Sequence, residues 1–276
     1  MNRDTLKDCK KIVIKIGSST ITHGATGELN LGKMEKLVRQ IADLKGEGRD
    51  VVLVSSGAIA CGRHTLGLTQ KPRSISQKQA LAALGQARLM MEYRKLFSEY
   101  DLRAAQILMT KDTIVDAALR QNAKNTFQEL LRFKAVPIVN ENDTISTYEI
   151  QFGDNDRLSA LVSALIEADA LLLLSDIEGL YTDDPHKNPN ATLIPEVLQV
   201  EDCLPMAKTT SSSDVGTGGM YTKLLAGNIA VRSGVNMVIA SGEDLGIIEH
   251  IMEGEEIGTF FPARREKDFD LSCFLR

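Results

Sequence analysis

The sequence predicts an α/β fold with a mainly parallel central sheet and helices on both of its faces. Short, strongly apolar segments of four to six residues alternate with longer segments of helical periodicity, and this alternation is typical of βαβ crossovers. Polar or glycine-rich clusters follow several of the apolar segments directly. Ligands in parallel sheets bind beyond the carboxyl ends of the strands, so we expect these clusters to line one shared cleft.

The predicted strands are rich in Val, Ile and Leu, as is typical of strands that are buried on both faces. In chain order they are Lys11–Ile16, Val51–Val54, Ala104–Leu108, Val136–Val139, Ala170–Leu174 and Val235–Ile239. The predicted helices have apolar residues at helical spacing and end near glycine or at the next strand. They are Leu31–Leu44, Ser76–Tyr100, Asp116–Phe133, Arg157–Ile166 and Met220–Arg232. The polar stretch 182–213 is expected to form loops and a small hairpin.

Composition narrows the class of protein. The chain has 32 Lys+Arg against 37 Asp+Glu, a net charge of -5 and no long run of either sign, which disfavours nucleic acid as a main partner. Four scattered cysteines fit no zinc spacing and suit a reducing cytoplasm. No signal-peptide core and no membrane span is visible. We find no internal repeat or interdomain linker, and expect one domain over residues 1–276.

Two lysines follow patterns that suit an anion. Gly216–Lys223 is a glycine-rich turn that opens a helix, where backbone N–H groups and the helix dipole favour a phosphate. It is neither a Walker loop nor a Rossmann fingerprint, and a flexible loop with an ordinary first-turn lysine is the alternative. Lys15 precedes Gly17-Ser-Ser, and its alternative is a solvated lysine on a strand. Together, Lys15 and Lys223 would supply the positive charge that phosphoryl transfer needs.

Two short segments contain more Asp, Asn and Glu side chains than a helix cap or a turn requires. Gly153-Asp-Asn-Asp156 precedes a helix, where a single residue suffices as a cap and the remaining carboxylates are available to align lysines or Mg²⁺. In Asn140-Glu-Asn-Asp143 a carboxylate suits an ammonium group, although the run also reads as a solvated turn. Ser55 and Ser56 are either small spacers or hydrogen-bond partners of a carboxylate.

These motifs together resemble the amino acid kinase family, and within it the kinases that phosphorylate the side chain of glutamate. The segments that carry the resemblance occur in order: Lys11–Ser19, Val54–Ala60, Val139–Asp143, Gly153–Asp156, Leu174–Thr182 and Gly216–Lys223. Each motif alone is weak, whereas the ordered set is specific. The resemblance extends from about residue 10 to about residue 262.

The resemblance implies a three-layer αβα sandwich and transfer of the ATP γ-phosphate to the side-chain carboxylate of L-glutamate, the first step of proline biosynthesis. It assigns Lys15 and Lys223 to phosphoryl stabilisation and Asp154 to the organisation of these lysines. Substrate binding falls to Ser56, Asp143, Asn155 and Asn140. ATP binding falls to Lys15, Ser175, Asp176, Thr217, Gly218, Gly219, Met220, Tyr221, Thr222 and Lys223. Mg²⁺ would bridge the ATP phosphates, with no protein ligand assigned to it.

The resemblance also carries expectations about organisation and partners. It places acceptor binding in residues of about 10–168 and nucleotide binding in about 169–262. Many bacterial relatives continue into a PUA domain, which we do not expect here because only a short charged tail follows Pro262. Proline as feedback inhibitor, a homo-oligomer, and glutamyl phosphate reductase as partner are further expectations.

Two alternatives stay open at the level of sequence. The first is a kinase of the same family with another acceptor, such as acetylglutamate, aspartate, carbamate or a uridine nucleotide. The second is a sensor that binds glutamate or proline without turnover. Retention of both Lys15 and Lys223 disfavours the sensor, since binding alone does not require phosphoryl stabilisation.

Overall fold

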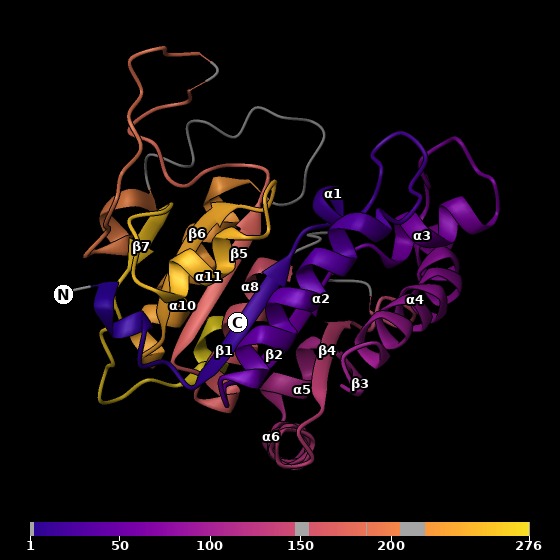
Figure 1. The fold of residues 1–276 in the computed structure, drawn as a ribbon, viewed down its shortest axis with the longest axis horizontal. Coiled ribbons are helices and arrows are strands. Elements are labelled where there is room, and N and C mark those ends of the chain that lie inside the picture. Colours follow the sequence, from indigo (N-terminus) through magenta and orange to yellow (C-terminus); the bar gives the residue numbers. More distant parts are fainter. Residues whose placement is uncertain (1–2, 147–154, 186, 205–218, 276) are drawn as a thin grey trace. The chain divides into compact units, whose positions relative to one another are not determined.

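The computed structural model describes residues 3–146, 155–185, 187–204 and 219–275. The chain divides into two compact units, which can be followed in Figure 1. The first unit combines Met1–Lys15 with Asp156–Arg276, and the second is Ile16–Asn155.

The first unit has four neighbouring strands in the order β1-β5-β6-β7. They are β1 (Lys11–Ile16), β5 (Ala170–Ser175), β6 (Asn236–Ser241) and β7 (Thr259–Phe261). β5 and β6 pair in parallel with Ala170 opposite Asn236, and β7 runs antiparallel to β6. All six residues of β5 are buried, as its unbroken apolar run predicts for a strand covered on both faces.

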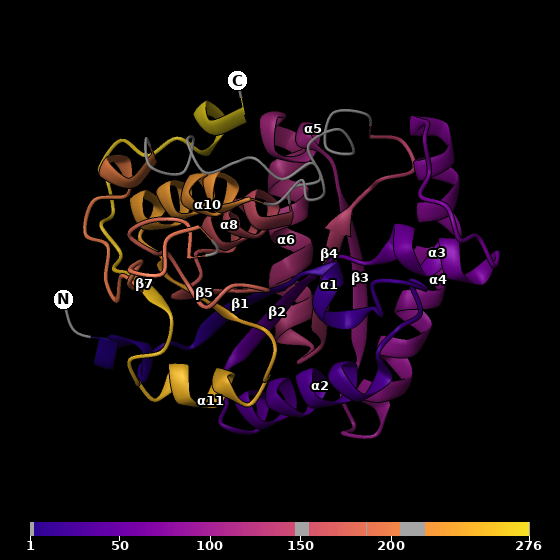
Figure 2. The same ribbon diagram turned by 90° about the horizontal axis from the view of Figure 1, so that it is seen from above.

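Helices cover both faces of these strands. The helical elements of the unit are η1 (Arg3–Leu6), α8 (Asn155–Ile166), α10 (Met220–Ser233), α11 (Ile247–Met252) and η2 (Leu271–Leu275). Figure 2 shows α8 and α10 on one face and α11 on the other. This arrangement confirms the predicted α/β architecture with layers of helix on each side of the strands.

The second unit has three strands in the order β3-β4-β2, and both pairs are parallel. They are β2 (Asp50–Ser55), β3 (Ala104–Met109) and β4 (Val136–Glu141). Its helices are α1 (Ser18–Ile21), α2 (Leu31–Gly46), α3 (Ala58–Thr65), α4 (Ile75–Ser98), α5 (Lys111–Val115) and α6 (Ala117–Arg132). α2 packs against β2, α4 against β3 and α6 against β4, so each crossover helix covers a strand to which it is joined.

The predicted strands and helices are confirmed to within one or two residues, and the differences have local causes. α8 begins at Asn155 rather than at Arg157. After β2 the chain turns at Gly57, which adopts a left-handed conformation (φ 108°), and it enters α3 at the next residue. β7 is too short to be recognised from periodicity. Leu193, in the described part of 182–213, forms an antiparallel bridge with Tyr181, just before this stretch, as expected for a small hairpin.

None of the helices that the structure describes is long and apolar enough to cross a membrane.

Candidate active site

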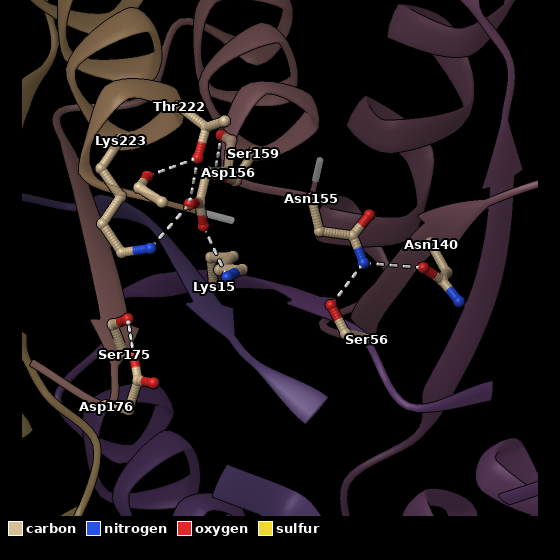
Figure 3. A network of polar contacts seen from close by, with 11 residues as sticks. Lys15, Ser56, Asn140, Asn155, Asp156, Ser159, Ser175, Asp176, Thr222 and Lys223 are labelled. Atoms are coloured by element: carbon tan, nitrogen blue, oxygen red, sulfur yellow. Dashed lines mark hydrogen bonds and ion pairs between the residues drawn. The ribbon is translucent and has the colours of Figure 1, made fainter. Parts of the chain in front are cut away.

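Two lysines from distant parts of the sequence meet at one carboxylate in the first unit. Lys15 lies near the end of β1, Asp156 in the first turn of α8, and Lys223 in the first turn of α10. Lys15 Nζ lies 2.5 Å from Asp156 Oδ1, and Lys223 Nζ lies 3.0 Å from Asp156 Oδ2. Figure 3 shows both lysine side chains directed at the carboxylate. Each carboxylate oxygen therefore has its own ammonium partner.

The three side chains are almost completely buried. The exposed fraction is 9% for Lys15, 4% for Lys223 and 2% for Asp156. Burial by itself would raise the pKa of Asp156, but the charges and hydrogen bonds of the two lysines outweigh this effect and lower the pKa below its usual value. The carboxyl group is thus ionised at neutral pH, and two ammonium groups against one carboxylate leave a net charge of about +1 in the cluster. A buried excess of positive charge favours an anionic ligand.

The N-terminus of α10 adds a second feature that suits an anion. Gly219 precedes this helix of 14 residues without a side-chain cap, and such helix N-termini bind phosphate through their N–H groups and dipole. Thr222 Oγ1 donates to the Gly219 carbonyl at 2.8 Å and lies 3.2 Å from Asp156 Oδ2. The first turn of α10 therefore contributes both Lys223 and a hydroxyl beside the carboxylate. The predicted ATP-binding residues Gly219, Met220 and Tyr221 lie at the start of this turn.

Two further residues predicted to bind ATP, Ser175 and Asp176, lie at the carboxyl end of β5. Ser175 is the last residue of this strand, and its Oγ donates to Asp176 Oδ1 at 2.9 Å. The parallel neighbour β6 ends beside it, with Ser175 opposite Ser241. This is the edge of a parallel sheet at which ligands bind.

Three predicted site residues lie outside the described residues: Asp154, Thr217 and Gly218. The role of organising the lysines was predicted for Asp154, and that prediction remains untested. Among the described residues it is Asp156, the last carboxylate of the same run, that bridges Lys15 and Lys223. The sequence contained a signal for Asp156, since it belongs to the acidic run, but the choice between the two carboxylates depends on where α8 begins.

A row of polar side chains lies in the second unit and contains three of the four predicted substrate-binding residues. Asn155 Nδ2 donates to Ser56 Oγ at 2.7 Å and to Asn140 Oδ1 at 2.9 Å. Asn140 Nδ2 donates in turn to Gln86 Oε1 at 2.9 Å. Figure 3 shows Asn155 between Ser56 and Asn140. Gln86, on α4, has no signal in the local sequence that distinguishes it from an ordinary helix residue, and we did not predict it.

The fourth predicted substrate-binding residue, Asp143, lines a pocket in the same unit. This α4–β4 pocket has a volume of about 270 Å³. Its walls include Ala82, Gln86 and Ala87 of α4, and Glu141, Asn142 and Asp143 at and after the end of β4. The pocket and the polar row share Gln86, so the predicted substrate-binding residues are contiguous within this unit.

Two buried lysines on one carboxylate, at the strand ends of an α/β fold, are typical of proteins that bind and transfer phosphoryl groups. Comparison with known sequences supports this class. The sequence model described as "Amino acid kinase family" matches residues 10–241. The chain therefore belongs to the amino acid kinase family.

Curated proteins with similar sequences indicate one particular kinase within this family. The glutamate 5-kinase of Carboxydothermus hydrogenoformans is 51% identical over 99% of this chain and 73% of the relative. The glutamate 5-kinase of Symbiobacterium thermophilum is 49% identical over 94% of this chain and 98% of the relative. A third glutamate 5-kinase, from Clostridium perfringens, is 46% identical over 95% of this chain and 99% of the relative.

A solved structure supports the fold independently. The UMP kinase from Bacillus anthracis superposes with a TM-score of 0.63 and covers 92% of this chain and 96% of its own. The two sequences are only 15% identical, so the likeness concerns the fold and not the substrate.

Proposed function

We propose that the protein transfers the γ-phosphoryl group of ATP to the side-chain carboxylate of L-glutamate, forming L-glutamyl 5-phosphate. The observation that carries the proposal is the buried Lys15–Asp156–Lys223 cluster in a chain that is 46–51% identical to glutamate 5-kinases. The acceptor carboxylate is already ionised at neutral pH, so the reaction needs positive charge and positioning rather than a strong general base.

The first unit would perform the phosphoryl half of the reaction. Lys15 and Lys223 donate hydrogen bonds to phosphoryl oxygens, and Asp156 holds both ammonium groups so that they do not need to reorganise during transfer. The N–H groups at the start of α10 and the end of β5 are assigned to the nucleotide phosphates. The net positive charge of the cluster would stabilise the charge that accumulates on the moving phosphoryl group.

The second unit would bind the acceptor. Ser56 Oγ accepts a hydrogen bond from Asn155, so the hydroxyl proton is free to donate to a carboxylate of glutamate. Asp143 in the wall of the α4–β4 pocket suits the α-ammonium group of an amino acid. The division into an acceptor part of about 10–168 and a nucleotide part of about 169–262 stays a prediction.

Mg²⁺ fits this proposal as an ion carried by the ATP phosphates, whose charge it neutralises when bound. Asp156 is already engaged by two lysines, which leaves it poorly suited as a metal ligand. In the described part of the chain, the one group of three side chains with metal-binding geometry is His250, Glu253 and Glu255, all exposed. It lies at and after α11 and contains none of the residues assigned to ATP. We therefore assign no protein ligand to Mg²⁺.

The test is ATP-dependent acyl-phosphate formation, trapped with hydroxylamine, with L-glutamate, N-acetylglutamate and L-aspartate as acceptors. We expect hydroxamate with L-glutamate alone. Product with another acceptor would support kinase activity but contradict the assignment of L-glutamate as the acceptor. Binding of glutamate without any product would favour the sensor.

Lys15→Ala and Lys223→Ala test the assignment of the phosphoryl site. Each variant is expected to lower kcat by about 10²-fold or more, since removal of one preorganised donor has an effect of this size. Glutamate binding, measured by calorimetry without ATP, should stay within about threefold of wild type. Near-normal turnover in either variant would contradict the role of that lysine.

The resemblance supports further proposals: inhibition by proline near the glutamate site, a homo-oligomer, location in the cytoplasm, and transfer of the labile product to glutamyl phosphate reductase. Proline inhibition is rejected if saturating proline leaves glutamate-dependent turnover unchanged.

A further inference from the structure

The row of polar side chains in the second unit has a fixed direction. Asn155 donates to Asn140, and Asn140 donates to Gln86 Oε1. Asn140 thus accepts through Oδ1 and donates through Nδ2, whereas Asn155 donates from Nδ2 to both of its neighbours. The oxygen of the Gln86 amide is therefore occupied by Asn140, and Nε2 is the polar atom of this amide that the row does not use.

Two buried polar atoms of the row lack a hydrogen-bond partner among the described residues. They are Nε2 of Gln86, at one end of the row, and Oδ1 of Asn155, in its middle. The exposed fraction is 7% for Gln86 and 9% for Asn155, and a buried polar atom without a partner destabilises the folded state. Native proteins rarely keep such atoms unpaired, and a ligand is one way in which they become satisfied.

Gln86 is also a wall of the α4–β4 pocket. The same pocket is lined by Asp143, which carries the proposed contact to the α-ammonium group. In an amino acid the α-ammonium and α-carboxylate groups share one carbon atom, so a pocket that binds the first also receives the second. Glu141 and Asp143 bring negative charge to this wall, and a carboxylate therefore needs a directed N–H donor there.

Close packing holds Gln86 in place. A Cβ atom on the preceding residue, Gly85, would lie 1.8 Å from the carbonyl oxygen of Ala58, which means that the backbones of α4 and α3 touch at this point. Ala58 begins α3 directly after Ser56 and Gly57. The side chain of Gln86 thus starts from a backbone that is fixed against the turn carrying Ser56, and such preorganisation lowers the entropic cost of binding.

We propose that Gln86 is a specificity-determining residue that donates a hydrogen bond from Nε2 to the α-carboxylate of the bound acceptor amino acid. The inference rests on the proposed function, because it takes glutamate as the ligand of the α4–β4 pocket. It adds Gln86, on α4, to the predicted substrate-binding residues, and it would supply a partner for an amide nitrogen that has none among the described residues.

The test compares two ligands that differ at the α-carboxylate. L-Glutamate carries this group, and L-isoglutamine has a neutral amide in its place while keeping the side-chain carboxylate. Calorimetry without ATP gives the ratio of their dissociation constants for wild type, Gln86→Met and Gln86→Leu. Both variants remove the donor with a side chain of similar volume, and the second serves if the first does not fold. Gln121→Met, at an exposed amide on α6 of the same unit, is the matched control.

We expect wild type and the control to prefer L-glutamate by at least about tenfold, and the Gln86 variants by less than about threefold, as for loss of one hydrogen bond to a charged group. An unchanged preference, or equal weakening of both ligands, would overturn the contact and leave Gln86 as a support of Asn140. Failure of wild type to bind L-glutamate would overturn this inference together with the acceptor assignment. Binding with the expected ratios but without acyl-phosphate formation would reject the proposed kinase function and keep the contact.

Discussion

At the scale of single residues, Asp156 holds the ammonium groups of both Lys15 and Lys223 in place. Asp156→Asn removes the carboxylate that both nearly buried ammonium groups contact, and so breaks both ion pairs. Breaking a buried ion pair in this way is expected to lower the free energy of unfolding by about 3–5 kcal/mol, and kcat should fall because the lysines lose their fixed positions. Denaturant unfolding and steady-state kinetics measure the two effects.

The control for this change is an exposed ion pair in the same unit. Arg232 Nη2 lies 2.7 Å from Glu266 Oε2, and both side chains are about one-third exposed. Glu266→Gln should change the stability by no more than about 1 kcal/mol, since exposed pairs contribute little. If Asp156→Asn lowered the free energy of unfolding no more than this control, the ion pairs of Asp156 with the two lysines would not stabilise the protein as expected.

The acid side of the stability profile tests the same residue. The pKa of Asp156 is lowered in the folded protein from its ordinary value of 3.8, because the two lysines outweigh the effect of burial. Its contribution to stability is complete above that ordinary value and is lost as the pH falls through the lower, folded-state pKa. Wild type should therefore lose more stability below about pH 4 than Asp156→Asn does. If the stability of wild type and of Asp156→Asn fell equally with decreasing pH, the pKa of Asp156 would not be lowered in the folded protein.

Site residues could be predicted from sequence where a motif fixes their position. They were harder to predict where their position depends on the residue at which a helix begins. Lys15 and Lys223 were predicted from the strand end and from the glycine-rich turn, and the structure brings them to one carboxylate. The run Gly153–Asp156 offers two aspartates, and only the start of α8 at Asn155 shows where Asp156 points. Gln86 was not predicted because its hydrogen-bond partner Asn140 is distant in sequence.

At the scale of secondary-structure elements, the packing of α3 on α4 fixes the backbone next to Ser56, the residue proposed to bind the acceptor. Gly85→Ala places a methyl group 1.8 Å from the Ala58 carbonyl oxygen, a backbone atom that cannot move without shifting α3. We expect a loss of about 1–3 kcal/mol or more in the free energy of unfolding, and weaker glutamate binding because Ser56 directly precedes the Gly57–Ala58 step. Denaturant unfolding and calorimetry measure these effects.

Gly46→Ala is the matched control, since a Cβ atom at Gly46, in the last turn of α2, meets nothing within 4 Å. This substitution should be neutral or stabilise the protein by up to about 1 kcal/mol through helix propensity. Equal stability of the two variants would show that α3 and α4 tolerate separation.

Long elements were predictable from sequence because their apolar periodicity is repeated over many residues. Strand β1 and helices α4 and α10 have nearly the predicted bounds. The eight residues of α3 include Gly62, where a Cβ atom would lie 2.0 Å from the Leu81 carbonyl oxygen. Such a glycine resembles a turn residue in the sequence, although it serves helix packing. The three residues of β7 give no periodicity at all.

At the scale of the whole molecule, the compact units do not follow the order of the sequence. The first unit joins residues 1–15 to residues 156–276, with β1 next to β5 in its strand order. Strand neighbours of this kind are separated by more than 140 residues, and composition or local periodicity carries no information about them. The predicted α/β class needed only the alternation of elements, which is why it could be derived although this grouping could not.

The proposed requirement for Mg²⁺ concerns the whole enzyme together with its nucleotide. If Mg²⁺ enters only with the ATP phosphates, removal of free Mg²⁺ by EDTA should abolish acyl-phosphate formation and leave the thermal unfolding of the nucleotide-free protein unchanged within about 1 °C. A metal held by protein side chains would instead stabilise the folded state by mass action, by about 2.7 kcal/mol at a hundredfold excess over its dissociation constant. That amount corresponds to several degrees in Tm for a protein of this size. Differential scanning calorimetry with EDTA and with added Mg²⁺, each in the absence of ATP, distinguishes the two cases. A metal-dependent Tm would mean that the chain itself supplies ligands and would overturn the assignment of the ion to the nucleotide.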